Sequence, residues 1–91
     1  MSVDRRLDPI RQIETLRSRY CRWIDTKQWD RLRGLFHPEA RFEGFGSAPA
    51  GCDVDTFISG VAKRLKQAIS VHQCFLPEIV FQNEGSARAV W

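Results

Sequence analysis

Asp25 and His72 are two residues whose types could together perform acid–base chemistry. Asp25 directly follows Ile24, the last apolar residue of a helical pattern, and His72 lies in a stretch rich in Val, Ile and Phe. If both side chains face the interior, the carboxylate of Asp25 can accept a hydrogen bond from Nδ1–H of His72. Nε2 would then be free to act as a general base, and the carboxylate would stabilise the imidazolium that forms. The alternative is a solvated carboxylate at a helix end and an unrelated histidine.

The three cysteines, Cys21, Cys52 and Cys74, do not indicate a metal centre. Their number is odd, and no two of them have the CxxC spacing of a structural zinc site. We therefore expect reduced thiols, no bound metal and no cofactor. Alternation along the chain places Cys74 on the same face as His72, where it could form a small apolar wall.

Apolar periodicity predicts the helices that must position these residues. The first helix is expected to begin with Asp8 as its cap and Pro9 at the first helical position, and to run to Asp25. Its apolar stripe consists of Ile10, Ile13, Leu16, Tyr20 and Ile24. A short second helix is expected over residues 29–36. A third is expected between a capping Asp53 and Ile69.

The strands are predicted mainly in the second half of the chain. Residues 41–45 alternate weakly, and residues 70–81 read as a long strand in which Pro77 implies an edge position or a bulge. Residues 83–85 have the composition of a hairpin turn that leads into a final strand over residues 86–91. This order favours an α+β domain with helices packed on one side of a curved sheet.

A chain of 91 residues is expected to form one domain, residues 1–91, with a modest core. Such a core favours a homodimer. The last predicted strand stops on Trp91 without a turn or polar tail, so we expect an incomplete domain that lacks its C-terminal strands.

Charge and hydropathy argue against several classes of protein. The longest uncharged run, residues 67–77, is far shorter than the about 20 apolar residues that span a bilayer. The N-terminus has no apolar stretch behind its charges, so we expect no signal peptide and a cytoplasmic location. Arginines crowd the start of the chain, and several lie off the apolar stripe, so a solvated helix face is favoured over a nucleic-acid-binding one. They are Arg5, Arg6, Arg11, Arg17, Arg19 and Arg22.

The order and spacing of residues between Ile13 and Phe42 resemble the opening of a SnoaL-like domain of the NTF2-like superfamily. The matching residues are Ile13, Leu16, Tyr20, Ile24, Asp25, Trp29, Asp30, Leu32, Leu35, Phe36, Pro38, Ala40, Arg41 and Phe42. Further on, Val71 and His72 open a stretch to Val80 that is similar to the second strand of the family. The resemblance covers nearly the whole chain, roughly residues 10–91.

This resemblance implies a cone-shaped α+β barrel, in which the N-terminal helices pack on a curved, mixed or antiparallel sheet around a pocket. In enzymatic relatives such as scytalone dehydratase, an Asp at the end of the first helix orients a His that removes a proton from an apolar substrate. Asp25 and His72 match these two positions. The resemblance to a family that includes scytalone dehydratase and polyketide cyclases implies a cofactor-independent lyase or isomerase. A non-catalytic ligand-binding or protein-interaction module is the alternative.

Four further residues are expected to line the pocket: Tyr20, Phe42, Cys74 and Leu76. Tyr20 could donate a hydrogen bond to a substrate oxygen or be a core aromatic, and the same two readings, pocket or core, apply to Phe42. Cys74 and Leu76 alternate onto the face of His72. The expected occupant is a small, mostly apolar molecule.

Overall fold

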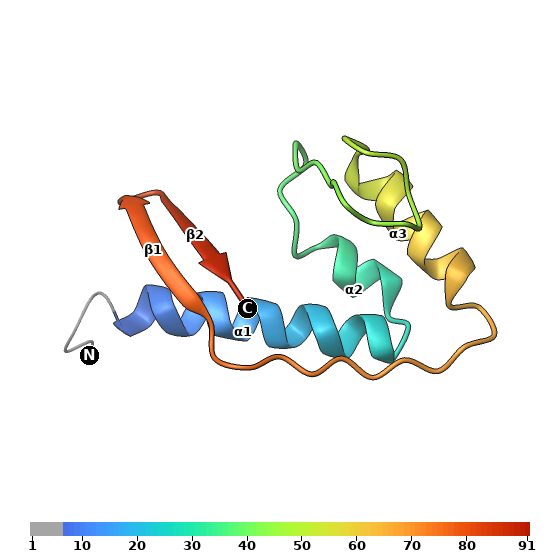
Figure 1. The fold of residues 1–91 in the computed structure, drawn as a ribbon, viewed down its shortest axis with the longest axis horizontal. Helices are drawn as coiled ribbons and strands as arrows, with labels where there is room; N and C mark the ends of the chain where they lie inside the picture. The colour runs from blue at the N-terminus through green and yellow to red at the C-terminus, as the bar shows by residue number, and fades with distance from the viewer. Residues whose placement is uncertain (1–6) are drawn as a thin grey trace.

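Three helices followed by a β-hairpin make up the computed structural model, which describes residues 7–91 (Figure 1). The elements are α1 (Leu7–Asp25), α2 (Trp29–Arg33), α3 (Val54–Arg64), β1 (Glu78–Asn83) and β2 (Ser86–Val90). Their order confirms the predicted α+β class. Arg5 and Arg6 lie outside the described residues.

α1 is the longest element and carries one half of the candidate site. α1 includes Leu7, so Asp8 lies within its first turn. The prediction that Asp8 is the N-cap of this helix is therefore wrong. A carboxylate in the first turn interacts favourably with the positive end of the helix dipole. Near the other end, Cys21 and Ile24 are buried. The prediction that the helix ends at Asp25 is confirmed.

The hydrophobic core lies among the end of α1, α2, α3 and the loop before α3. Its buried members are Ile24, Leu32, Phe42, Val54, Phe57 and Ile58. Leu32 and Phe57 are fully buried. The rings of Phe42 and Phe57 stack with centroids 4.0 Å apart and planes 2° apart. This core anchors the end of α1 from which the Asp25 side chain projects.

α3 confirms one prediction and corrects another. The backbone N–H of Thr56 donates to Oδ1 of Asp53 at 2.9 Å, so Asp53 is the predicted N-cap. The helix ends at Arg64, five residues before the predicted end at Ile69. Because the Ile69 side chain is 94% exposed, no burial favours continuing the helix to that residue.

The hairpin is formed by antiparallel pairing of β1 with β2, with Glu78 opposite Val90 and Phe81 opposite Ala87. The predicted turn between them is confirmed, and Oδ1 of Asn83 accepts a hydrogen bond from the N–H of Gly85 at 2.8 Å. In the described residues the sheet has only these two strands and is not closed.

Two strand predictions are corrected by the structure. The strand predicted over residues 70–81 forms only from Glu78, directly after Pro77, and residues 70–77 are irregular. The strand predicted over residues 41–45 is reduced to a single bridge between Phe42 and Cys52. In both places the backbone lacks a neighbouring strand long enough to form a ladder, and alternation in the sequence does not by itself provide one.

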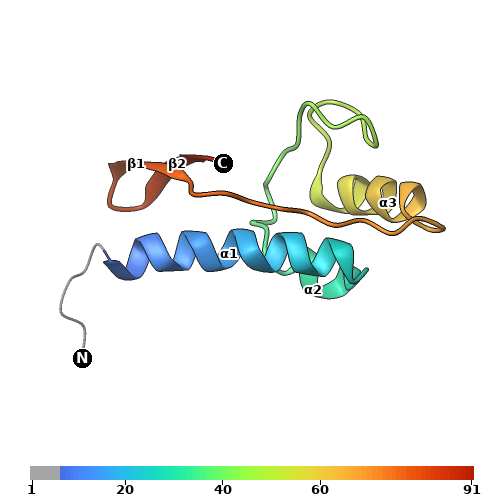
Figure 2. The ribbon, with the colours of Figure 1, turned by 60° about the horizontal axis from the view of Figure 1, so that its bottom comes forward.

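The irregular segment, residues 65–77, crosses the molecule from the end of α3 to the hairpin. Figures 1 and 2 both show it running alongside α1 in the opposite direction. The hairpin lies over the N-terminal half of α1, and α2 and α3 lie towards its C-terminal end (Figure 2). The molecule is elongated, with extents of 45 × 25 × 21 Å. This arrangement brings residues 70–74 beside the last turns of α1.

Candidate functional site

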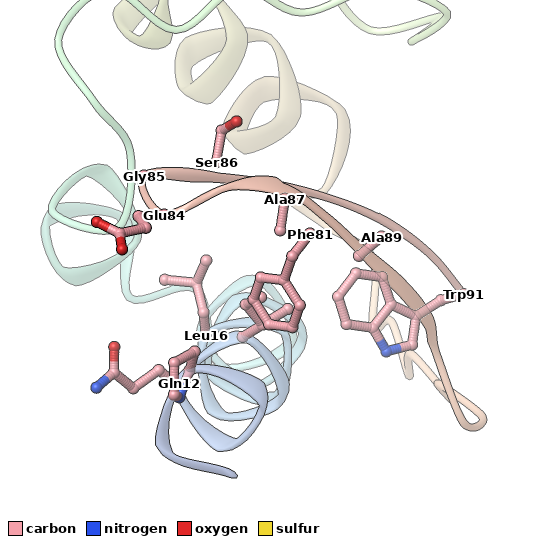
Figure 3. Close-up of a pocket in the computed structure, with 11 residues that line it drawn as sticks. Gln12, Leu16, Phe81, Glu84, Gly85, Ser86, Ala87, Ala89 and Trp91 are labelled. Carbon is pink, nitrogen blue, oxygen red and sulfur yellow. The ribbon is translucent and has the colours of Figure 1, made fainter. Parts of the chain in front are cut away.

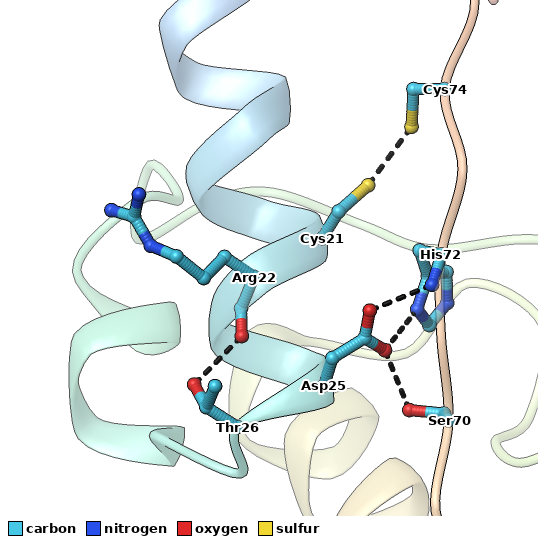
Figure 4. A network of polar contacts seen from close by, with 7 residues as sticks. All are labelled: Cys21, Arg22, Asp25, Thr26, Ser70, His72 and Cys74. Carbon is cyan, nitrogen blue, oxygen red and sulfur yellow. Dashed lines mark hydrogen bonds and ion pairs between the residues drawn. The ribbon is translucent and has the colours of Figure 1, made fainter.

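Asp25 and His72 are in direct contact. Nδ1 of His72 lies 2.5 Å from Oδ1 of Asp25 (Figure 4). The Asp25 side chain is 19% exposed and that of His72 is 37% exposed. Asp25 is therefore not the solvated helix terminus of the alternative reading, and its carboxylate faces the segment that carries His72.

Two further hydrogen bonds fix the Asp25 carboxylate. The hydroxyl of Ser70 donates to Oδ1 at 2.6 Å, and the backbone N–H of His72 donates to Oδ2 at 2.6 Å. A carboxylate at the C-terminal end of a helix opposes the helix dipole. These donors compensate for that position, and both come from the segment beside α1. Ser70 was not among the predicted site residues, although it precedes His72 by two positions and so shares its face in an extended chain.

The hydrogen bonds also set the electrostatics of the pair. Burial of Asp25 opposes its ionisation, but the hydrogen bonds from Ser70 and from the backbone and ring of His72 outweigh it and lower the pKa of the carboxyl. An ionised carboxylate can only accept hydrogen bonds. In neutral His72 the proton is therefore on Nδ1, and the lone pair is on Nε2. Among residues 7–91, no hydrogen bond or ion pair engages Nε2.

α1 and the extended segment that carries His72 and Cys74 advance by similar distances between their contact points. One turn of four residues along α1, from Cys21 to Asp25, advances about 6.0 Å. Two residues of extended chain, from Cys74 back to His72, advance about 6.6 Å. The two segments therefore meet at two successive points, Asp25 with His72 and Cys21 with Cys74 (Figure 4). The expected shared face of His72 and Cys74 is observed, on an extended segment rather than a strand.

The second contact joins two thiols. Sγ of Cys21 lies 2.9 Å from Sγ of Cys74, and both cysteines are free. Burial of Cys21, together with its hydrogen bond to Cys74, raises the pKa of that thiol to about 11. The hydrogen bond from Cys21, with a contribution from the guanidinium of Arg17, lowers the pKa of the exposed Cys74 thiol. Cys21 was not predicted as a site residue, although its position one turn before Asp25 was a usable signal.

An open cavity of about 390 Å³ surrounds both contacts. Its lining residues are Ser18, Cys21, Arg22, Asp25, Thr26, His72 and Cys74. A molecule in this cavity can therefore reach the imidazole of His72. The wall is mixed in character, with thiols and the carboxylate side by side, and Arg22 is the basic side chain on its rim.

A second cavity, of about 510 Å³, lies between α1 and the hairpin (Figure 3). Phe81, Ala89 and Trp91 face Leu16 of α1 across it, so its wall is largely apolar. Neither Asp25 nor His72 lines this cavity. The molecule thus has an apolar cavity and a separate cavity lined by Asp25 and His72, both along α1.

The structure places the other predicted pocket residues away from the pair. Phe42 is 8% exposed and belongs to the core, because its ring stacks on Phe57. Tyr20 packs edge-on against Phe36 at 6.1 Å, and burial raises the pKa of its hydroxyl. Leu76 is 89% exposed and lines neither cavity. Of the four, only Cys74 lies beside His72.

Three features of the described residues bear on other kinds of site. Within residues 7–91, no group of three or more His, Cys, Asp or Glu side chains is arranged to hold a metal ion. No helix among these residues is long and apolar enough to cross a membrane. Arg11, Arg19 and Arg22 line a shallow polar surface of α1 together with Glu14, which mixes the two signs of charge.

The order of three helices and an antiparallel hairpin fits a small-molecule-binding α+β domain of the NTF2-like superfamily. The chain belongs to the SnoaL-like domain family, whose model matches residues 5–91. No curated protein and no solved structure gives a significant match to the chain.

The lowered pKa of Asp25 predicts how acid affects the fold. Because the folded-state pKa lies below the ordinary value of 3.8, ionised Asp25 stabilises the fold above that value. This contribution is lost as the pH falls through the folded-state pKa. We expect Asp25→Asn to lower the free energy of unfolding at neutral pH, and the difference from wild type to shrink below about pH 3.8.

Urea unfolding over a series of pH values measures this difference. Asp30→Asn is the matched control, since the Asp30 side chain is fully exposed. If the difference in free energy of unfolding between wild type and Asp25→Asn did not change with pH, the stabilising role of the hydrogen bonds to the Asp25 carboxylate would be contradicted.

Proposed function

We propose that this SnoaL-like domain removes a proton from a small, mostly apolar carbon acid, with Nε2 of His72 as the general base and Asp25 as its orienting partner. The observation that carries the proposal is the 2.5 Å contact between Nδ1 of His72 and Oδ1 of Asp25. It holds the ring through Nδ1 and leaves Nε2 as the basic nitrogen. A positioned base of this kind typically contributes about 10²–10⁴ in rate.

The chemistry balances without a cofactor. Nε2 takes the proton, and the electron pair of the C–H bond forms a new double bond. In a lyase this pair expels a leaving group from the neighbouring carbon; in an isomerase the imidazolium returns the proton to another carbon. The Asp25 carboxylate stabilises the imidazolium in either case. A homodimer, which would cover more of the exposed apolar surface, belongs to the same proposal.

A non-catalytic ligand-binding module is the second candidate. The observation in its favour is that the larger and more apolar cavity, between α1 and the hairpin, contains neither member of the pair. A ligand held only there would bind without reaching Nε2 of His72.

Deuterium exchange separates the two candidates. The chain is incubated in D₂O with a panel of cyclic ketones that differ in ring size and in the presence of a β-leaving group, and NMR follows both exchange and elimination. Ligand-observed saturation transfer records binding in the same samples. The enzyme reading predicts exchange at an acidic carbon of at least one bound ketone. Binding without exchange across the panel favours the binding module.

A further inference from the structure

The contact between Cys21 and Cys74 has no part in the proposed proton transfer. Cys21 is buried on α1 at 7% exposure, and Cys74 is exposed on the segment beside it, 53 positions further along the chain. Their sulfur atoms point towards one another at 2.9 Å (Figure 4). A disulfide bond is about 2.0 Å long. The two sulfurs are therefore about 0.9 Å from bonding distance, between elements that are already in contact.

The two thiols differ in the ways that a stepwise oxidation requires. The Cys74 side chain is open to solvent and lines the 390 Å³ cavity, so a small oxidant can reach its sulfur. Its pKa is lowered by the hydrogen bond from Cys21 and by Arg17, which favours the thiolate that attacks oxidants. Cys21 is shielded from solvent, and its pKa of about 11 keeps the thiol protonated. It is therefore expected to react only after Cys74 has been oxidised.

We propose that Cys21 and Cys74 form a reversible dithiol site that is oxidised to a disulfide by hydrogen peroxide or a small organic hydroperoxide. The thiolate of Cys74 attacks the terminal oxygen, the O–O bond breaks, and the leaving oxygen is protonated to water or an alcohol. The resulting sulfenic acid is attacked by the sulfur of Cys21, which loses its proton. The S–O bond breaks and a water molecule leaves, so that one hydroperoxide is reduced for each disulfide formed. Two molecules of a low-molecular-weight thiol return both cysteines to the reduced form by successive exchange steps, and are themselves joined in a disulfide.

The disulfide would act on the neighbouring contact. Cys21 lies one turn before Asp25, and Cys74 lies two residues after His72. A covalent bond at the first point fixes the register of the irregular segment against α1, and so holds His72 beside Asp25. The inference rests on the geometry, exposure and pKa of the two thiols and does not depend on the proposed proton transfer.

The test uses the full chain, fully reduced and then treated with one equivalent of hydrogen peroxide. Free thiols are counted after alkylation under denaturing conditions, and the linked peptides are identified by mass spectrometry. We expect the thiol count to fall from three to one, with Cys52 still free and Cys21 joined to Cys74 within the same chain. The oxidised chain should resist urea better than the reduced chain, since the bond closes a long loop.

Three variants assign the roles. Cys52→Ser is the matched control and should lose both of its thiols, as Cys52 lies at the bridge to Phe42 away from the pair. Cys21→Ser should accumulate a sulfenic acid on Cys74 that dimedone traps. Cys74→Ser should keep both remaining thiols at the same peroxide dose.

Three outcomes in the wild-type chain would overturn the proposal. They are oxidation of Cys74 to a sulfinic acid without a disulfide, disulfides that involve Cys52, and disulfides between chains. Because peptide mapping of the wild-type chain decides among these outcomes, the test does not depend on the folding of a variant with a serine at buried position 21.

Discussion

His72→Ala is expected to slow deuterium exchange into a bound carbon acid by a factor of about 10²–10⁴ and to leave ligand binding nearly unchanged. The variant removes Nε2, the proposed base, but keeps the backbone N–H of residue 72, which still donates to Asp25. Exchange is measured by NMR in D₂O, and binding by saturation transfer in the same samples. Added imidazole should restore part of the exchange, since the cavity beside Asp25 is open.

His37→Ala provides the matched control, because His37 is the other of the two histidines and lies exposed in a turn. It should exchange at the wild-type rate. Asp25→Asn should reduce the rate as well, and the amide cannot provide the negative charge that stabilises the imidazolium. An unchanged rate in His72→Ala would contradict the proposed role of the base.

Phe57→Ala is expected to be the most destabilising single substitution considered, by about 3–5 kcal/mol. Phe57 is fully buried, its ring stacks on Phe42, and Phe36 and Phe45 pack edge-on against it. A chain of 91 residues has a typical free energy of unfolding of about 5–14 kcal/mol. The substitution would therefore remove a large part of the stability, and the end of α1 that presents Asp25 would lose its support.

Urea unfolding followed by circular dichroism measures the effect. Phe75→Ala is the matched control, since the Phe75 side chain is 81% exposed, and it should change the free energy by no more than about 0.5 kcal/mol. Equal effects of the two substitutions would contradict the assignment of the core to the helices.

Local patterns predicted the parts of the fold that local interactions determine. The apolar stripe of α1 and its end at Asp25 follow from helical periodicity, and the cap at Asp53 follows from residue type. The hairpin turn at residues 83–85 follows from its composition. Each of these features depends on residues close together in the chain.

The strand predicted over residues 70–81 forms only from Glu78, and its first part, residues 70–77, shows what local patterns do not determine. Its alternation is real, since His72 and Cys74 both face α1, but the N–H of His72 donates to the carboxylate of Asp25 rather than to a neighbouring strand. Alternation in the sequence reports which side chains share a face. It does not report whether a helix or a strand lies against that face.

The candidate site was predictable to a similar degree. The pairing of Asp25 with His72 was suggested by their types and positions and supported by the resemblance to the family, and the structure brings the two side chains together. Ser70, the polar partner of Asp25, and Cys21, the thiol partner of Cys74, could not be predicted without knowing the register between α1 and the irregular segment. Phe42 was predicted to line the pocket but lies in the core. The sequence could not distinguish the two, because an aromatic residue at a strand-like position is equally compatible with a pocket wall and with the core.

The most direct test of the pair is the position of the proton on the two neutral imidazoles, read from long-range ¹H–¹⁵N NMR correlations. Nδ1 of His37 accepts a hydrogen bond from the N–H of Glu39 at 3.0 Å, so its proton should be on Nε2. His72 should show the opposite tautomer, with the proton on Nδ1, and should lose that preference in Asp25→Asn. A proton on Nε2 of His72, or a tautomer that Asp25→Asn leaves unchanged, would contradict an orienting role for Asp25.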